Sequence, residues 1–316
     1  MQKFSLLIST LVLLFSTSCS SSNGQVAEQS AKPSAPRFVI SLKATAQADK
    51  YWSVIAQGAA EKAKELGAEL ITANAEDGAA QVKQLEEQLA NGVSGIAVAP
   101  IDASLLGPLQ QKAQAANVPF IMIENNANLA HVNYVGTDEE AAGRLAADYI
   151  CNPENSLIAR NTEAAIISGS ATDSVSQERA AGSRWGLEDC RLKVVEEENA
   201  NNDPALAQTV ATDILSKHQN VEILLVTDDR MAEGVVQAAK TAGRNGKIVI
   251  ISFGTAPKTI DSIIDGNITA TVAQNPDVIG SRGIESLYMM LNDESIPAAY
   301  DTGTRLVTLQ NASQFR

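Results

Sequence analysis

From residue 37 onward, the chain alternates short apolar runs with longer stretches whose apolar positions recur at helical spacing. The short runs are continuously apolar, as in IAVA at 96–99 and IVII at 248–251. Continuous runs are typical of parallel strands buried on both faces, because a strand with one solvated face alternates apolar and polar residues. Strands that alternate with helices of about 10–15 residues form βαβ units, so the pattern predicts an α/β fold with doubly wound parallel sheets.

The expected strands form two series of five, which indicates two similar lobes. The first series comprises Phe38–Leu42, Glu69–Ala73, Gly95–Ala99, Phe120–Ile123 and Val132–Val135, and the second Ala164–Ile167, Lys193–Glu196, Glu222–Val226, Lys247–Ser252 and Ala270–Ala273. Helical stretches lie between them, among them Tyr51–Leu66, Ala79–Asn91, Ser104–Asn117, Pro204–Lys217 and Met231–Ala242. In each half, an Asn-Val pair leads from a long helix into a strand, at 117–118 and at 220–221.

The first 36 residues follow a different pattern, that of an export signal and a linker. Lys3 precedes an apolar run over Leu6–Phe15, which is too short to span a bilayer stably, and small residues precede Cys19. We predict a signal peptide over residues 1–18 and a lipidated tether over 19–36, with Cys19 as the acylated residue. Ser16 stands where the bacterial lipobox usually has Leu, so ordinary secretory cleavage is the alternative. The mature protein is then exported and anchored, in the periplasm or on the outer face of the cytoplasmic membrane.

Length and charge narrow the class of protein. The 316 residues suit two lobes of ordinary domain size, and 45% hydrophobic residues are enough for real cores. The formal charge is −13, and the Lys and Arg residues form no visible cluster. Because nucleic-acid binders normally carry a basic patch, the sequence predicts no nucleic-acid partner.

Cys151 and Cys190 are the other two cysteines. A pair of thiols in an oxidising compartment often forms a bridge, and two buried free thiols are the alternative. Each cysteine ends an expected helix, 138–150 and 177–189. In a βαβ lobe both helix ends return to the sheet edge away from the ligand side, so we predict a Cys151–Cys190 disulfide there.

Six segments, in this order, resemble the periplasmic sugar-binding proteins of the ribose-binding type. They are VISL…DKYWSVIAQGAAEKAKELGAEL, QVKQLEEQLANGVSGIAVAPID, VGTDEEAAGRLAADYI, QERAAGSRWGL, TDDRMAEGVVQAAKTAG and AQNPDVIGSRGIESL. The resemblance implies two lobes, 37–136 with 275–302 and 137–274 with 303–316, that close on a ligand by hinge bending. The chain would cross between the lobes three times, near Gly136–Asp138, Gln274–Asn275 and Thr302–Thr304. Sugar-responsive repressors share the fold, but here a signal peptide replaces their helix-turn-helix.

Ligands of open parallel sheets bind beyond the carboxyl ends of the strands, which selects residues without any family knowledge. In a sugar site, aromatic rings cover the apolar faces, while acids, amides and Arg pair with hydroxyls. The resulting ligand-binding set, to which the resemblance adds Gln274, is Asp49, Tyr51, Trp52, Glu124, Asn125, Arg179, Asp228, Phe253 and Gln274. In this set we expect Arg179 to make a forked pair of hydrogen bonds to ligand hydroxyls.

Several of these assignments have alternatives. If Tyr51 and Trp52 do not bind ligand, we expect one ring in the core and the other exposed. If Arg179 does not bind ligand, we expect it to be a surface charge. Asp229 either contacts ligand or caps the helix that starts near Met231. Trp185, on the helix after Arg179, is expected in the core.

Three positions depart from the ribose-binding pattern. Asn125 stands where ribose binders have Arg, Gly254 where they have Asp, and Asn202 near an aromatic position. The departures predict a ligand other than ribose, with extra room beside Gly254. The acids of the set disfavour an anionic ligand.

We therefore predict a solute-binding lipoprotein that captures a small neutral sugar or polyol for the permease of an ABC importer. A sensory receptor that presents a bound sugar to a histidine kinase or chemoreceptor is the first alternative, and a sugar hydrolase or isomerase is the second. The sequence contains no GxSxG, GxGxxG or GxxxxGK[ST] and no His/Cys cluster with metal-ligand spacing. We expect no catalysis, cofactor or metal.

Overall fold

The computed structural model describes residues 35–44, 49–126, 129–157 and 162–316. The expected signal peptide, Cys19 and nearly all of the expected tether lie outside these ranges. Residues 1–34 and 35–316 are separate units, and only the second is described below. Within the described ranges, none of the helices combines the length and apolar character needed to cross a bilayer.

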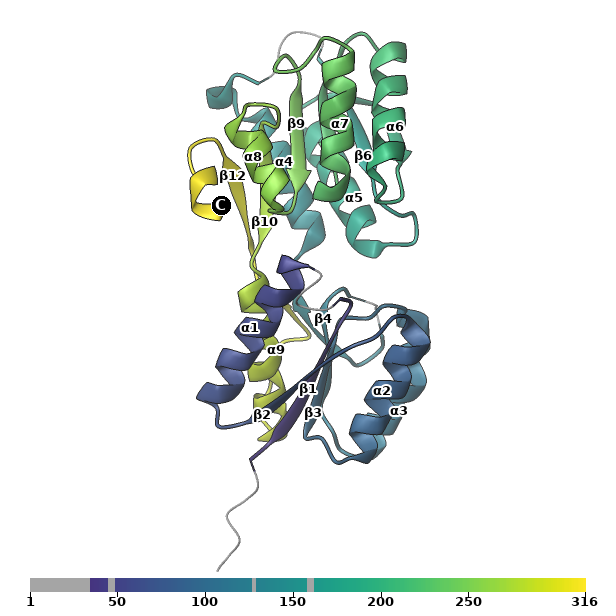
Figure 1. The fold of residues 1–316 in the computed structure, drawn as a ribbon, viewed down its shortest axis with the longest axis vertical. Coiled ribbons are helices and arrows are strands. Elements are labelled where there is room, and N and C mark those ends of the chain that lie inside the picture. Colours follow the sequence, from purple (N-terminus) through teal and green to yellow (C-terminus); the bar gives the residue numbers. More distant parts are fainter. Residues whose placement is uncertain (1–34, 45–48, 127–128, 158–161) are drawn as a thin grey trace, which may run out of the picture. The chain divides into compact units, whose positions relative to one another are not determined.

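Among the described residues, six strands form the first sheet, in the order β11-β5-β4-β3-β1-β2, and all neighbours are parallel. The strands are β1 (Arg37–Leu42), β2 (Glu69–Asn74), β3 (Gly95–Val98), β4 (Phe120–Glu124), β5 (Asn133–Gly136) and β11 (Ala299–Asp301). Successive residues point to opposite faces, so Phe38 and Val39 belong to different cores. Helices α1 (Lys50–Glu65) and α9 (Pro276–Leu291) cover one face, and α2 (Gly78–Ala90) and α3 (Leu106–Ala115) cover the other (Figure 1).

Six described strands also form the second sheet, in the order β12-β10-β9-β8-β6-β7. They are β6 (Glu163–Ser168), β7 (Lys193–Asn199), β8 (Val221–Val226), β9 (Val249–Phe253), β10 (Ala270–Gln274) and β12 (Thr304–Thr308). Strand β12 is antiparallel to β10, whereas the other pairings are parallel. We expected neither β11 nor β12, nor any antiparallel edge.

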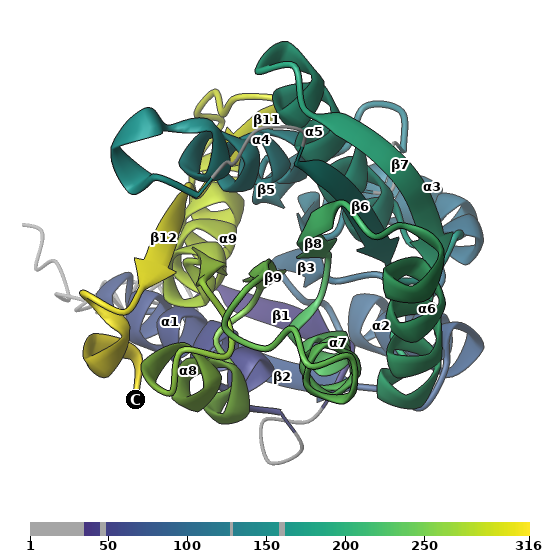
Figure 2. The ribbon, with the colours of Figure 1, turned by 90° about the horizontal axis from the view of Figure 1, so that it is seen from above.

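Helices cover both faces of the second sheet as well (Figure 2). One layer contains α4 (Glu139–Cys151) and α5 (Ser174–Asp189), and the other contains α6 (Pro204–Lys217), α7 (Asp229–Thr241) and α8 (Pro257–Ile264). Short 3₁₀ segments lie at Ala103–Leu105, Pro153–Asn155 and Ala312–Phe315. The two doubly wound lobes expected from the hydrophobic pattern are therefore confirmed.

Aspartate side chains start many of these helices. Asp49, Asp77, Asp138, Asp173, Asp203 and Asp228 each accept a hydrogen bond from a backbone N–H in the first turn of the following helix. This satisfies donors that the helix leaves unpaired at its start. Part of the excess of acidic residues therefore consists of aspartates that cap helices and mark where the helices begin.

The chain passes between the two sheets after Gly136, after Gln274 and after Asp301. Hydrogen bonds join the three crossings to one another. The Thr302 amide donates to the Gly136 carbonyl at 2.7 Å, and the Asn275 side chain donates to the Thr302 carbonyl at 2.9 Å. The three segments therefore form one bonded unit where the predicted hinge lies.

The second lobe is cross-linked by a disulfide. Cys151 is the last residue of α4 and Cys190 is the C-cap of α5, and the two sulfurs are bonded with the Cα atoms 6.1 Å apart. The bridge lies at the carboxyl ends of both helices, opposite the edge where β6 and β8 end. The bridge predicted from the sequence is present.

Candidate functional site

The carboxyl ends of β1 and β4 bring together residues predicted from the first lobe. The Lys43 ammonium, just beyond β1, is 2.7 Å from a carboxylate oxygen of Glu124 at the end of β4. The same ammonium lies 5.8 Å from the centre of the Trp52 ring. Trp52 meets Tyr51 edge to face, with ring centroids 5.3 Å apart. The strand-end rule selects Lys43 from the sequence as well, because it directly follows β1, but Lys43 is not among the predicted ligand contacts.

The two adjacent rings pack against the same core but differ in exposure. Trp52 is only 7% exposed and belongs to the core that α1 and α9 form on the first sheet. The Tyr51 hydroxyl is buried and has no hydrogen-bond partner among the described residues. Burial raises the pKa of Tyr51 well above its ordinary value, and the Glu124 and Glu139 carboxylates raise it further. A buried, unpaired hydroxyl costs about 1–3 kcal/mol, so this phenol is suited to receiving a polar ligand group.

Glu124 has an unusual backbone conformation. Its φ is 66°, in the left-handed region that a residue with a Cβ seldom adopts. The Tyr134 hydroxyl donates to the Glu124 carbonyl oxygen at 2.8 Å and holds this turn. Strained residues of this kind concentrate at binding and catalytic sites.

In the second lobe, Arg179 on α5 makes contacts that the sequence analysis did not foresee. Its Nε lies 2.6 Å and its Nη2 3.2 Å from the two carboxylate oxygens of Glu139. Its Nη1 donates to the Thr227 carbonyl at 3.0 Å, and its guanidinium lies 5.1 Å from the centre of the Phe253 ring. The fork expected on ligand hydroxyls is therefore made to Glu139, because a guanidinium only 6% exposed needs a counter-charge within the protein.

The close approach of α4 and α5 places Glu139 against Arg179. A Cβ on Gly182 would lie 2.0 Å from the Glu140 carbonyl oxygen, and one on Gly143 would lie 2.3 Å from the Arg179 carbonyl oxygen. Glycine at both contacts lets the two backbones touch. The first residue of α4 thus meets Arg179 in the interior.

The charges of this pair are shaped by burial. Burial raises the pKa of Glu139 to about 7, against the opposing pull of Arg179. Burial lowers the pKa of Arg179, but the charge and hydrogen bonds of Glu139, together with the charge of Asp228, more than offset it and raise the pKa. The Gln274 amide donates to Glu139 Oε1 at 2.8 Å and to Thr137 Oγ1 at 3.0 Å. Arg179, Phe253 and Gln274 are thus brought together around an acid that the prediction missed.

Asp49 and Asp228 have backbone roles in addition to their place in the predicted set. Each is a helix N-cap, accepting from the amides of Tyr51 at 2.8 Å and Arg230 at 2.9 Å. Asp228 also accepts from the Arg230 side chain, with Nε–Oδ1 at 2.9 Å and Nη2–Oδ2 at 3.1 Å. Both acids lie at the predicted strand ends.

Asp229 corrects two expectations. Asp228, rather than Asp229, caps α7. Asp229 Oδ2 accepts from the Ala256 amide at 2.8 Å, and a Cβ on Gly254 would lie 2.3 Å from that same oxygen. The room expected beside Gly254 is therefore filled by the Asp229 carboxylate. Burial raises the pKa of this group to about 6.

The remaining predicted residue, Asn125, joins the two lobes. Its side-chain oxygen accepts from the hydroxyl of Ser174, the first residue of α5, at 2.9 Å. Trp185, expected in the core, is 40% exposed, with the Arg144 guanidinium 5.8 Å from its ring centre. The small residues of α5 face α4 instead.

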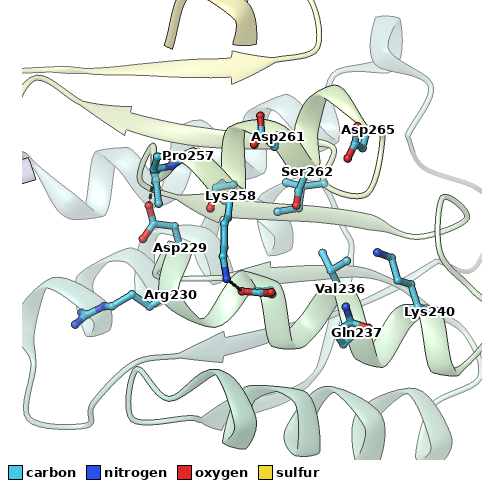
Figure 3. A pocket seen from close by; sticks show the side chains of 14 residues that line it. Asp229, Arg230, Val236, Gln237, Lys240, Pro257, Lys258, Asp261, Ser262 and Asp265 are labelled. Atoms are coloured by element: carbon cyan, nitrogen blue, oxygen red, sulfur yellow. Dashed lines mark hydrogen bonds and ion pairs between the residues drawn. The ribbon is translucent and has the colours of Figure 1, made fainter. Parts of the chain in front are cut away.

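A surface hollow of about 570 Å³ lies between α7 and α8 (Figure 3). Charged side chains line much of it, and Lys258 pairs with Glu233 at 2.9 Å across it. Its described lining contains no residue of the predicted ligand-binding set and includes the neighbouring Asp229, Arg230 and Ala256. Aromatic and hydrogen-bonding groups converge at the strand ends. The strand ends are therefore a better candidate site than the hollow.

Comparisons with known proteins agree with this architecture. The family model described as "Periplasmic binding protein domain" matches residues 38–295. The chain is 26% identical to the ribose import binding protein RbsB of Bacillus subtilis over 310 residues, 98% of this chain and 99% of that protein. It is 29% identical to the D-allose-binding periplasmic protein of Escherichia coli, over 79% of this chain and 83% of that protein. Among solved structures, GanP from Geobacillus stearothermophilus, described as a glucose-galactose binding protein, matches with a TM-score of 0.77 and 26% identity, over 88% of this chain and 98% of that one.

The family match covers most of the chain and includes every residue of the predicted ligand-binding set. The structural match extends over both sheets. The chain therefore belongs to the periplasmic binding proteins, and it is of the ribose type that its sequence motifs indicate.

Proposed function

We propose that this protein is an exported lipoprotein that binds a small neutral sugar or polyol at the facing strand ends of its two lobes and delivers it to an ABC permease. The proposed contacts are Asp49, Tyr51, Trp52, Glu124, Asn125, Arg179, Asp228, Phe253 and Gln274. Tyr51 supplies ring surface, the buried Phe253 ring supports the Arg179 guanidinium from the core, and the acids, amides and Arg179 pair with hydroxyls.

The pairing of charges at these strand ends carries the proposal. Lys43 pairs with Glu124 at 2.7 Å, Arg179 with Glu139 at 2.6 Å and Arg230 with Asp228 at 2.9 Å. Cations that are already neutralised offer little to an anion. Hydroxyl groups, in contrast, both donate to the carboxylates and accept from the remaining N–H groups. The set is therefore suited to a neutral ligand rich in hydroxyls.

The names of the relatives support a sugar without selecting one. Proteins at similar identity are named for ribose, D-allose and glucose or galactose. Binding of a sugar is common to these names, while the sugar differs. We therefore propose the class of ligand, a small neutral sugar or polyol.

A thermal-shift panel of pentoses, hexoses, polyols and sugar phosphates tests the class of ligand. A ligand that binds only the folded protein stabilises it by about 2.7 kcal/mol at about 100 times its Kd. For a protein of this size we expect a rise in Tm of about 5 °C for at least one neutral sugar or polyol, and a smaller rise for its phosphate ester. The largest rise with a sugar phosphate, or none with any neutral sugar or polyol, would contradict the proposal.

Membrane attachment through Cys19 is a separate prediction. Acyl chains on Cys19 would hold the protein at the membrane, because two lipid chains supply the binding energy that one chain lacks. We expect wild-type protein in the membrane fraction, Cys19→Ser in the soluble fraction, and the control Ser22→Ala in the membrane fraction. Soluble wild-type protein without acyl chains would show that the signal is an ordinary secretory one.

A further inference from the structure

Among the acids of the described site, Glu139 contacts both Arg179 and Gln274 of the predicted set. Glu139 is 2% exposed. Its two carboxylate oxygens accept hydrogen bonds from the Arg179 guanidinium, and Oε1 also accepts one from the Gln274 amide at 2.8 Å. An ionised carboxylate accepts all three hydrogen bonds, because both of its oxygens are acceptors. The direction of the Arg179 guanidinium and that of the Gln274 carboxamide are therefore set by the same side chain.

Glu139 also lies next to two of the three crossings. It follows Thr137 and Asp138, which leave the first sheet, while Gln274 ends β10 just before the chain returns to the first lobe. The Asp138 amide donates to the Asp301 side chain at 3.0 Å, which joins the start of α4 to the third crossing. The carboxylate that holds Arg179 therefore lies next to a crossing that is hydrogen-bonded to the third one.

We propose that Glu139 is a positioning residue for ligand binding, which orients Arg179 and Gln274 and links their position to the hinge crossings. The inference deepens the proposed function and rests on it. Glu139 acts through its neighbours: Arg179 and Gln274 meet the ligand, and Glu139 fixes their geometry. Fixed donors bind more tightly than mobile ones, because less side-chain freedom is lost on binding.

The charge of Glu139 gives the role a pH signature. Its electrostatic neighbours are Arg179 and Glu178 on α5, Glu124 on β4, Tyr134 on β5 and Tyr51 on α1. Burial raises the pKa of Glu139 to about 7. A raised pKa in an acid means that this group favours the folded state at low pH, and the gain is lost as the pH rises through about 7. The effect of Glu139 on ligand binding has the opposite dependence on pH. Only the ionised carboxylate accepts all the hydrogen bonds from Arg179 and Gln274, so the positioning is strongest at high pH.

The variants Glu139→Gln and Glu139→Asp test the proposal, with Glu140→Gln as the matched control. Glu140 is the next residue of α4, and its side chain is 45% exposed, so its replacement removes the same charge outside the site. With the sugar found in the thermal-shift panel, we expect Glu139→Gln to raise the Kd at pH 8 by about 10-fold or more. We expect the wild-type Kd to rise as the pH falls from 8 to 5.5 and those of Glu139→Asp and Glu140→Gln to keep that slope. Glu139→Gln should lose most of the slope, with the remainder due to Asp229, whose pKa of about 6 lies in the same range.

A second measurement needs no ligand. The Nε–H resonance of Arg179 in ¹⁵N-labelled protein at pH 8, assigned by its loss in Arg179→Lys, reports how firmly the guanidinium is held. We expect a slowly exchanging signal in wild type and Glu140→Gln, and rapid exchange in Glu139→Gln. An unchanged signal in folded Glu139→Gln would overturn the positioning role, and so would a Kd within about twofold of wild type with the pH slope retained. Failure of the wild-type protein to bind any sugar would instead reject the proposed function, while the Arg179 signal would still decide the role of Glu139.

Discussion

Arg179→Met is expected to reduce both ligand binding and stability. The guanidinium is 6% exposed and is the counter-charge of the buried Glu139. Removing one partner of a buried ion pair leaves the other charge uncompensated, which costs about 3–5 kcal/mol. Loss of its charge-assisted bonds to the sugar should weaken binding by about 10-fold to 100-fold. Denaturant titration and calorimetry measure the two effects.

The loss of stability should depend on pH. Without Arg179, the pKa of Glu139 rises further, so protonation relieves the uncompensated charge at acid pH. Arg179→Met should therefore be more destabilising at pH 8 than at pH 5. Arg184→Met is the matched control, since this Arg on the same helix pairs with Glu197 at 2.8 Å and both side chains are about one-third exposed. We expect it to cost less than about 1 kcal/mol. Equal costs for the two variants would show that Arg179 is an ordinary surface charge.

Removal of the disulfide is expected to lower stability without changing affinity. The bridge joins residues 39 apart in sequence, and closing a loop of that length stabilises the folded state by about 4 kcal/mol in the chain-entropy account. The 13 residues of α4 separate Cys151 from Glu139 by about 18 Å along the helix axis. The cross-link therefore stabilises the second lobe at a distance from the proposed ligand.

The double variant Cys151→Ala/Cys190→Ala measures this effect. We expect a Tm about 10 °C lower than that of the oxidised wild type, with the Kd for the sugar unchanged within about twofold. Wild-type protein treated with a reductant should match the variant. A Tm equal to that of the oxidised wild type would show that the bridge contributes no stability.

Strands that are buried on both faces are the easiest to predict from the sequence. IAVA at 96–99 and IVII at 248–251 have no solvated side, so their apolar runs are continuous and visible. Strands β11 and β12 lie at sheet edges, and β11 is a partly exposed AYD of three residues. These two strands have no continuous apolar run in the sequence. They are recognisable as strands only from their pairing with a neighbouring strand.

The site was predictable to a similar extent. The rule that ligands bind at carboxyl ends of strands selects residues such as Glu124 and Arg179 from sequence order alone. The same rule selects Lys43, which directly follows β1. The pairing of Lys43 with Glu124 and of Glu139 with Arg179 depends on how strand ends and helices meet in space. Glu139 follows the end of β5 and one of the expected crossings, a signal that was available. Trp185 was misplaced because the close contact of α4 and α5 accommodates small side chains and leaves an indole outside.

The most direct test of the account is a crystal structure of the protein grown with the sugar that raises its Tm most. We predict that the sugar lies at the facing strand ends of the two sheets, with its hydroxyls within hydrogen-bond distance of Tyr51, Arg179 and Gln274. The Glu139 carboxylate should still hold the Arg179 guanidinium in that complex. A sugar bound instead in the hollow between α7 and α8, with no contact to Tyr51 or Arg179, would contradict the account.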